Sequence, residues 1–296
     1  MALWGSLFPA VKLGYRAFQI DTGSVADVLM FAAMRFTVCG FLVSLFCLFR
    51  RKKAPVPKAP ALLKIVLVGL FAVVLHYACT YIGLTTTDSS KTALIKQAGS
   101  LIYVCFAFLF FKDEKFSIWK IAGALIGFAG IVAINWSGNR VTFRIGDLLI
   151  LAASVCTVIS GVLSRYAVRD ASPLWVTGIS QLSGGLILLI VALLMGGALP
   201  KPTPGGILIF TYICAASVTG YTLWYYILKS TELSKLYIIK FAEPLFACLF
   251  GALLLSENIL KWQYAAAFIL ISLGIILGHL ETKKAAADKS SAADPE

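Results

Sequence analysis

Two lysines lie inside apolar segments, where charged side chains are rare. Lys96 stands in TALIKQAG, just before the apolar run SLIYVCFAFLFF, and Lys240 stands in LYIIKFAE. An ammonium group within a membrane-spanning helix costs roughly 3 kcal/mol on insertion scales, so it is expected to face a wet cavity, a partner or the membrane interface. Two such groups in one cavity would act as point charges for a carboxylate or a phosphate.

The elements that carry these lysines are expected to be transmembrane helices. The chain has 296 residues, is 59% hydrophobic and only 14% charged, and has a mean hydropathy of +0.88. Soluble domains are usually about 25% charged. A helix needs roughly 20 mostly apolar residues to cross the bilayer, and ten segments are candidates, which predicts an all-α integral membrane fold. They are residues 2–18, 28–49, 64–84, 92–111, 119–134, 146–166, 173–195, 206–228, 236–255 and 262–280.

The positive charges indicate how these helices are oriented. The formal net charge of +12 would suit a nucleic-acid partner, but most of the cations fall in short loops between apolar segments. Of the 26 lysines and arginines, 16 fall on the side that holds both termini, 5 on the other side, and 5 in or at the ends of spans. Short cytoplasmic loops are rich in Lys and Arg. We therefore expect both termini in the cytoplasm, a multi-pass protein of the cell inner membrane, and no nucleic-acid partner.

The chain contains an internal repeat at an offset of 143 residues. FKDEKFSIWKIAGALIGFAGIVAI, residues 111–134, aligns with LLSENILKWQYAAAFILISLGIIL, residues 254–277. Each half then holds five helices, and an odd number makes the halves enter the membrane in opposite directions. Inverted repeats with a site near the midplane are typical of transporters, although duplication also builds channels and inert scaffolds. The predicted division is a first repeat at 1–140, a second repeat at 141–284 and a disordered cytoplasmic tail at 285–296.

Several motifs resemble the drug/metabolite transporter superfamily, in its EamA-type branch. They are WGSLFPAVK in the first span, MRF in the second, KDEKFSIWKIAGALIGFAGI at the end of the first half and AEPLFACLFGALLLSE in the ninth span. The resemblance implies ten helices in two inverted halves around a central cavity. In such transporters the third, fourth, eighth and ninth helices line this cavity, with help from the first and sixth. The family includes exporters of amino acids and other metabolites, and its eukaryotic relatives exchange anionic sugar nucleotides and sugar phosphates.

Lys96 and Lys240 lie at near-equivalent positions of the two halves, because they are 144 residues apart. Their backbones flank the midplane from opposite sides, so both ammonium groups could enter one cavity; alternatively, both could snorkel back to the headgroups. Pro244 removes the helical partner of the Lys240 carbonyl and opens a polar notch there. Glu243 lies three residues from Lys240 on the same face, either as a neutralising partner or as a proton-responsive group. Gln97 occupies the repeat position of Lys240 and is a candidate hydrogen-bonding group.

Further polar and aromatic residues are candidates for the cavity wall. The third span contributes a histidine and two tyrosines, the eighth contributes three aromatic residues, and Lys12 in the first span either joins the site or snorkels outward. Arg35 of the MRF motif is interpreted as structural, and Gly123, Gly127 and Gly130 as a stripe for close helix packing. The aromatic candidates and the histidine are His76, Tyr77, Tyr81, Tyr221, Trp224 and Tyr225.

These observations favour a secondary transporter that moves a small organic anion or zwitterion by alternating access, with the lipid bilayer and a small-molecule substrate as partners. An exporter of neutral or aromatic metabolites or drugs, with the lysines only snorkelling, is the alternative within transport. A channel and an intramembrane enzyme are weaker alternatives, since no HExxH or GxSxG motif is present. The seven cysteines form no CxxC or Cys/His cluster, and no P-loop is present, so we expect no metal, cofactor or ATP-driven step. We expect a monomer or weak homodimer.

Overall fold

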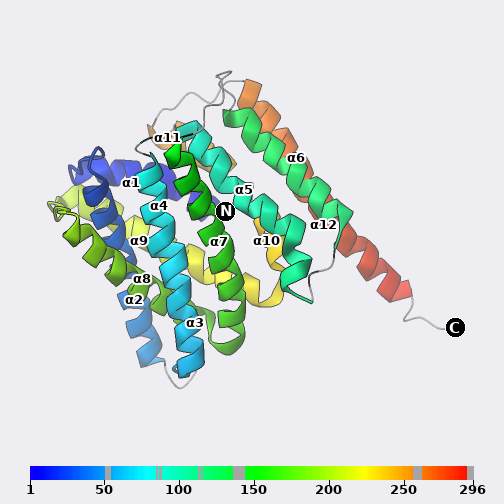
Figure 1. The fold of residues 1–296 in the computed structure, drawn as a ribbon, viewed down its shortest axis with the longest axis horizontal. Helices are drawn as coiled ribbons and strands as arrows, with labels where there is room; N and C mark the ends of the chain where they lie inside the picture. The colour runs from blue at the N-terminus through cyan, green and yellow to red at the C-terminus, as the bar shows by residue number, and fades with distance from the viewer. Residues whose placement is uncertain are drawn as a thin grey trace.

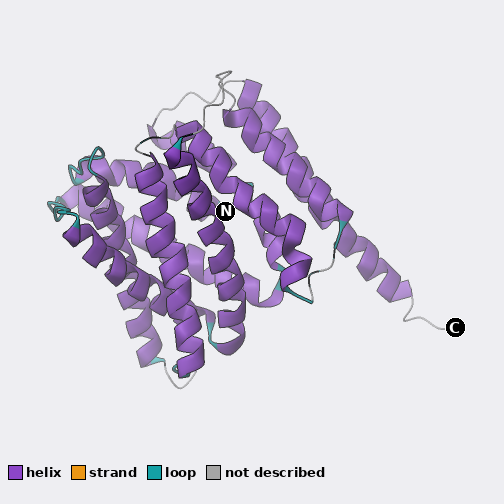
Figure 2. Ribbon diagram, viewed as in Figure 1, coloured by secondary structure: helices purple, strands orange, loops and turns teal. Residues whose placement is uncertain are grey.

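The computed structural model describes residues 1–50, 55–84, 86, 89–112, 114, 116–135, 144–255 and 262–291, and these form a helical bundle without strands (Figure 2). Ten helical segments follow one another along the chain, two of which are interrupted, so the predicted all-α fold is confirmed. The elements are α1 (Ala2–Ala17), α2 (Val25–Phe49), α3 (Ala59–Gly69), η1 (Leu70–Leu75), α4 (His76–Leu84), α5 (Ser89–Phe110), α6 (Ile118–Asn135), α7 (Ile145–Asp170), α8 (Pro173–Leu194), α9 (Pro204–Ser230), α10 (Leu233–Lys240), α11 (Glu243–Leu255) and α12 (Trp262–Ser291).

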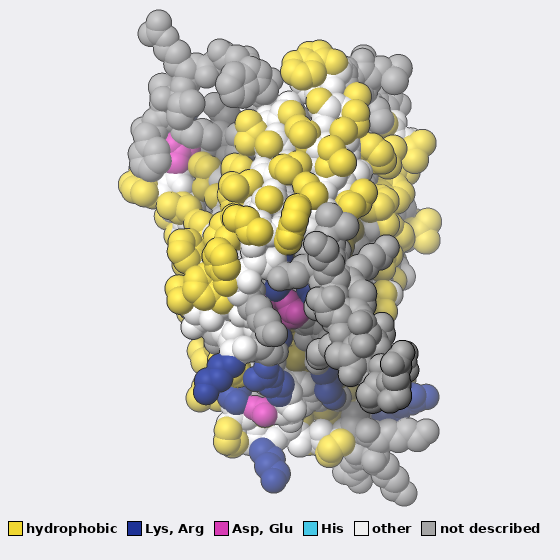
Figure 3. Space-filling view, turned by 90° about the vertical axis from the view of Figure 1, so that its right-hand side faces the viewer, with side chains coloured by type: hydrophobic (Ala, Val, Ile, Leu, Met, Phe, Trp, Pro, Cys, Tyr) yellow, Lys and Arg dark blue, Asp and Glu magenta, His cyan; other side chains and the backbone are white. Residues whose placement is uncertain are grey.

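Helix lengths and hydropathy fit a membrane protein. Six stretches of the described chain are long and apolar enough to cross a bilayer, and shorter apolar stretches occur in α5, α6 and α12. Large apolar side chains cover the outside of the bundle; Phe49 and Leu194, for example, are each 83% exposed. Figure 3 shows one face on which hydrophobic side chains form a broad band, while Lys and Arg gather toward one end. This surface suits lipid around the bundle and water at its charged end. The six stretches are 25–49, 59–83, 145–170, 173–194, 204–230 and 233–255.

Three helices begin at a hydroxyl cap. Ser24, Ser172 and Thr203 each accept a hydrogen bond from the backbone N–H three residues later, at the start of α2, α8 and α9. Such a cap satisfies one of the free N–H groups of the first turn. Pro173 and Pro204 follow two of these caps, in the first helical position, where a missing N–H costs nothing. Local sequence therefore fixes where these spans start.

Two spans are interrupted next to residues of the candidate site. The third span contains a π-helical stretch, η1, immediately before His76. The ninth span ends as α10 at Lys240 and resumes as α11 at Glu243. The sequence predicts one continuous span here, with a polar notch at the Lys240 carbonyl, because the ring nitrogen of Pro244 cannot donate to it; the structure has a full break at this place. Both interruptions place polar residues where the helix is irregular.

The last helices of the two halves pack against each other along small residues. α6 and α12 lie side by side at one edge of the bundle (Figure 1). A Cβ atom placed on Gly123 would lie 2.5 Å from the carbonyl oxygen of Gly274, and a Cβ on Gly274 would lie 2.5 Å from that of Gly123. Gly127 and Gly130 are similarly close to Phe241 and Ile271. Close helix packing thus accounts for the glycine stripe, as expected from the sequence.

Helix α12 differs from the sequence-based expectation for the tail. We expect disorder from residue 285 onward, whereas α12 continues to Ser291. The alanines at 285–287 have the highest helix propensity of any residue, so they favour continuation of the preceding helix. The remaining residues of the predicted tail, 292–296, lie outside the described part of the chain.

Candidate functional site

Lys96 and Lys240 come together in the structure with Glu243. Lys96 lies in α5, while Lys240 is the last residue of α10 and Glu243 the first of α11. All three side chains are partly buried, and Lys96 interacts electrostatically with both Glu243 and Lys240. Neither ammonium group has a hydrogen bond or ion pair at contact distance within the described residues. The two halves of the chain therefore contribute one cation each to a single charged cluster.

His76 connects this cluster to α7. Its Nδ1 lies 3.0 Å from Thr157 Oγ1 and 3.2 Å from the carbonyl oxygen of Ala153. His76 also interacts electrostatically with Lys96 and Lys240. His76 is thus packed against α7 and also interacts with both lysines of the cluster.

Aromatic rings surround the ammonium group of Lys240. Its Nζ lies 5.8 Å from the ring centre of Trp4 and 5.9 Å from that of Tyr237. Trp4 packs at 5.2 Å against Trp224 and at 5.5 Å against Tyr221. A cation over such ring faces is stabilised by the negative charge of the π system. We call Trp4, Tyr221, Trp224 and Tyr237 the aromatic wall.

Two polar atoms next to the wall lack hydrogen-bond partners. Glu243 Oε2 and Trp4 Nε1 are both buried, and no described residue donates to the former or accepts from the latter. A buried polar atom without a partner usually costs about 1–3 kcal/mol. An acceptor and a donor left unpaired beside the two lysines are the features expected of a site that a ligand completes.

The other predicted site residues divide into those near the cluster and those away from it. Tyr77 accepts a hydrogen bond from Arg35 at 2.9 Å, and the hydroxyl of Tyr81 lies 3.3 Å from that of Tyr15. Tyr225 is 3% exposed and belongs to the apolar core instead of a cavity wall. Tyr225 hydrogen-bonds with serines of α7 and α8, Ser164 and Ser180.

Lys12 and Gln97 are the remaining predicted residues. Lys12 is exposed on the surface of α1, which agrees with its outward alternative. Gln97 is partly buried, and its side chain makes no hydrogen bond to the cluster within the described residues. It follows Lys96 directly on α5, and neighbouring positions on one helix face different directions.

Sequence reasoning missed three residues: Trp4 and Tyr237, which lie beside Lys240, and Thr157, which contacts His76. Tyr237 lies three residues before Lys240 and therefore shares its helical face, so spacing alone could have identified it. Trp4 lies in the WGSLFPAVK motif, but only the packing of α1 against α9 and α11 shows which face it presents. Thr157 is reached through His76 and has no comparable signal.

A second charged cluster lies away from the lysine site, where the α5–α6 link meets α7 and α10. Glu114 is fully buried and accepts from Arg165 Nη1 at 2.6 Å, from the Ser234 backbone N–H at 3.2 Å and from the Ser234 hydroxyl. Lys120 Nζ lies 3.5 Å from Glu114 and also binds Glu232. We call these residues the Glu114 network.

Glu232 joins this network through two lysines. Besides Lys120, Lys235 Nζ contacts its carboxylate at 2.9 Å. Burial alone would raise the pKa of the Glu232 carboxyl, but the hydrogen bonds and charges of the two lysines outweigh burial and hold that pKa below its ordinary value. The carboxylate is therefore in its charged form at neutral pH.

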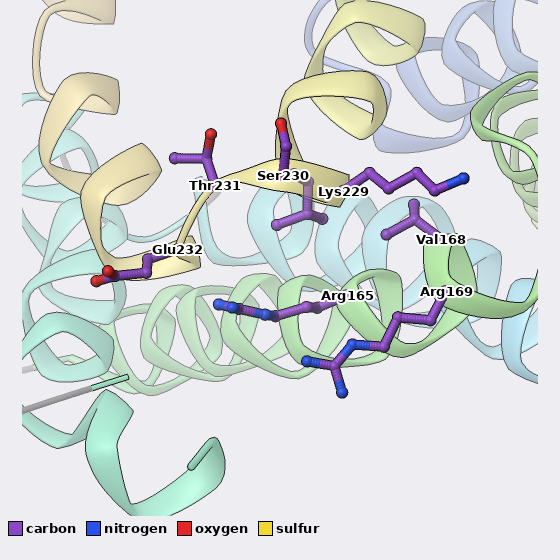
Figure 4. Close-up of a pocket in the computed structure, with 8 residues that line it drawn as sticks. Arg165, Val168, Arg169, Lys229, Ser230, Thr231 and Glu232 are labelled. Atoms are coloured by element: carbon purple, nitrogen blue, oxygen red, sulfur yellow. The ribbon is translucent and has the colours of Figure 1, made fainter. Parts of the chain in front are cut away.

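A cavity of about 270 Å³ opens beside the Glu114 network, between α7 and the link from α9 to α10 (Figure 4). Arg165 and Arg169 extend from α7, and Lys229 lies at the end of α9. The cavity lies at the end of the spans where the sequence concentrates its positive charge. No group of three or more metal-ligating side chains occurs within the described ranges.

Comparison with known proteins gives one family. A model of the EamA-like transporter family matches residues 1–136 and again residues 144–278. The uncharacterized inner membrane transporter YedA of Escherichia coli (strain K12) is 26% identical over 283 residues, which cover 92% of this chain and 88% of YedA. A chloroplastic WAT1-related protein of Arabidopsis thaliana is 25% identical, over 90% of this chain and 64% of its own length.

A solved structure supports the same architecture. The crystal structure of another protein aligns with a TM-score of 0.74 over 94% of this chain and 98% of that one, at 20% sequence identity. At this identity the likeness concerns the fold alone. An uncharacterized transporter of Archaeoglobus fulgidus is 23% identical over 87% of both chains, so the similarity extends beyond bacteria and plants.

Proposed function

Because the chain belongs to the EamA-like transporter family, within the drug/metabolite transporter superfamily, we propose that it moves a small organic anion or zwitterion by alternating access. The observation that carries this proposal is the cluster of Lys96, Lys240 and Glu243. Two ammonium groups oppose one carboxylate, so the cluster has a net charge of +1 that a negatively charged group on the substrate would neutralise.

The proposed mechanism uses the two-fold organisation of the chain. Lys96 belongs to the first proposed repeat, and Lys240 and Glu243 belong to the second. In an inverted-repeat transporter the halves rock around a fixed central site. A substrate held between cations from both halves would stay in contact with both halves during this motion. Its binding would therefore stabilise the inward-open and the outward-open state alike. We place both termini in the cytoplasm of an inner-membrane protein, by the charge of the loops and by likeness to YedA, and the working unit as a monomer or weak homodimer.

The aromatic wall favours a second candidate, an exporter of neutral or aromatic metabolites. Trp4 and Trp224 offer ring faces beside Lys240, and flat apolar substrates stack on such faces. In that case the lysines would contribute solubility and packing but no recognition. The two candidates differ in what happens when a lysine loses its charge.

Transport by purified protein in liposomes tests the choice. The variants are Lys96→Gln and Lys240→Gln, with Lys201→Gln, an exposed loop lysine, as the matched control. We expect each site variant to abolish exchange of carboxylate probes, because the neutral amide removes one of two cations, while Lys201→Gln leaves exchange unchanged. Full exchange of anions by both site variants would reject the proposal, and retained transport of aromatic neutral solutes alone would establish the second candidate.

A further inference from the structure

Arg35 is a buried cation at the middle of α2 with no carboxylate beside it. Its side chain lies in the core, and the residue is 6% exposed. Within the described residues it forms no ion pair; Nη2 donates to the Tyr77 hydroxyl at 2.9 Å, and Nε is buried without a partner. Its guanidinium lies 4.3 Å from the ring centre of Phe36. Charged residues at membrane depth are costly and usually have a counter-charge or a functional role.

The charged and polar groups that interact most strongly with Arg35 among the described residues are tyrosines, not carboxylates. Four tyrosines interact with it electrostatically, and they come from α1, α4 and α9. A structural strut between α2 and α4 would need only the neutral hydrogen bond to Tyr77. A guanidinium with an unused N–H among phenol groups instead matches the donor set that binds a carboxylate in two-pronged fashion. The four are Tyr15, Tyr77, Tyr81 and Tyr221.

The aromatic wall connects Arg35 to the lysine cluster. Lys240 lies over the ring of Trp4, and the ring centre of Trp4 lies 5.5 Å from that of Tyr221. The ring centre of Tyr221 lies 6.3 Å from that of Phe36, and the guanidinium of Arg35 lies over the Phe36 ring. Tyr221 interacts electrostatically with both Arg35 and Glu243. One wall of rings thus has a cation at each end.

Helix α4 makes the same connection on another side. His76, at its first residue, interacts with Lys96 and Lys240, and the next residue, Tyr77, binds Arg35. Adjacent residues on an α-helix point about 100° apart. The π-helical stretch η1 ends immediately before them, and such stretches occur frequently at functional sites. Its end fixes the direction of the first turn of α4, in which His76 interacts with Lys96 and Lys240 while Tyr77 binds Arg35.

We propose that Arg35 and Tyr77 form a second anion-binding pole of the central site, and that the substrate is a dianion with one acidic group at each pole. Counting Arg35, Lys96, Lys240 and Glu243, the site carries a net charge of +2, which a dicarboxylate neutralises. The inference rests on the proposed function, since it assigns the second charge of the same substrate. It also replaces the purely structural interpretation of Arg35.

Binding of matched acids to the purified, full-length protein tests the second pole. The probes are linear α,ω-dicarboxylates of increasing length and the monocarboxylates with the same carbon skeleton, assayed by ligand-induced shift in melting temperature. We expect one dicarboxylate length to bind at least about tenfold more tightly than its monocarboxylate, since it engages a second charged pair. Arg35→Gln should remove this preference, so that the affinity for the dicarboxylate falls to that for its monocarboxylate. Arg35→Lys should retain part of the preference, because the positive charge remains without the two parallel N–H groups of the guanidinium.

The outcomes separate this inference from the proposed function. Wild-type protein that binds both acid series equally, or an Arg35→Gln variant that weakens both equally, would overturn the second pole. In that case, loss of monocarboxylate binding in Lys96→Gln would leave the proposed function standing. Absence of binding by every acid would overturn the second pole and the anionic substrate of the proposed function. The dependence on dicarboxylate length is measured on the wild-type protein and needs no variant. If Arg35→Gln does not fold, Tyr77→Phe, which keeps the ring, is the second test. An unchanged dicarboxylate preference in Tyr77→Phe would count against the role of Tyr77.

Discussion

Glu114 and Arg165 form a buried ion pair, 2.6 Å between Oε1 and Nη1, that joins the α5–α6 link to α7. The pair connects the two proposed repeats, because Glu114 belongs to the first and Arg165 to the second. Ser234 at the start of α10 completes the coordination of the same carboxylate. One acidic side chain thus holds together the α5–α6 link, α7 and the start of α10.

Glu114→Gln is expected to destabilise the folded protein by about 3–5 kcal/mol, because it leaves Arg165 and Lys120 buried without their shared counter-charge. Thermal or denaturant unfolding in detergent measures the loss. Asp170→Asn is the matched control: the pair between Asp170 and Lys64 is exposed, with side-chain exposures of 43% and 38%, and should contribute at most about 1 kcal/mol. Equal effects of the two substitutions would contradict the assigned importance of burial.

Acid should weaken the Glu114 network through Glu232. The pKa of this carboxyl lies below its ordinary value of 4.5, with burial opposed by the stronger effect of Lys120 and Lys235. A carboxyl whose pKa is lower in the folded state stabilises the fold at pH above the ordinary value and loses this contribution as the pH falls through the lowered pKa. Melting temperatures between roughly pH 3 and pH 7 should therefore decline on the acidic side. Glu232→Gln should make this decline shallower, and an unchanged profile would argue against the assignment.

Gly123→Ala is expected to push α6 and α12 apart. The added Cβ would lie 2.5 Å from the carbonyl oxygen of Gly274 and 2.6 Å from the backbone nitrogen of Gly278, and backbone atoms cannot rotate away. Overpacking of this kind costs about 1–3 kcal/mol. Gly205→Ala, also within a helix but with nothing within 4 Å of the added Cβ, is the control and should be neutral or stabilising by up to about 1 kcal/mol. Comparable losses in both would show that helix contact is not the cause.

Glu243→Gln should tighten the binding of anionic substrates. Its carboxylate competes with the substrate for Lys96, and removing about 1 kcal/mol of such competition corresponds to about a fivefold lower Kd. Titration of the purified protein with a dicarboxylate measures the change, and the Glu232→Gln variant controls for loss of a carboxylate elsewhere. Weaker binding of the dicarboxylate by Glu243→Gln would contradict the competition for Lys96.

The sequence predicts the architecture well because hydrophobic length is a strong signal. Ten apolar segments of the sequence become ten helical segments among the described residues, and the polar notch expected at Pro244 coincides with the break between α10 and α11. The internal repeat relates the positions of Lys96 and Lys240, and their shared role in a site stays a prediction. Hydrophobic length and the missing N–H of proline are local signals, so the sequence alone reveals them.

The remaining features depend on contacts between distant helices. The π-helical stretch η1 has no local residue signal, because its register is decided by the helices packed around it. Trp4 and Tyr225 show the same limit: both are aromatic residues in apolar spans, yet packing puts the first beside Lys240 and the second in the core. The Glu114 network joins residues from 114 to 235, which no short motif reveals.

The extra residue held in η1 makes the recognition chemistry sensitive to chain length as well as to residue identity. A single deletion between residues 70 and 75 would restore a regular α-helix and turn His76 and Tyr77 by about 100° relative to the preceding turns. Tyr77 would then take the direction that His76 has now, toward the lysine cluster, and His76 would turn away from it, without any change of side chain. Homologous chains could thus come to differ in recognition by gaining or losing one codon in η1, with every side chain of the candidate site unchanged.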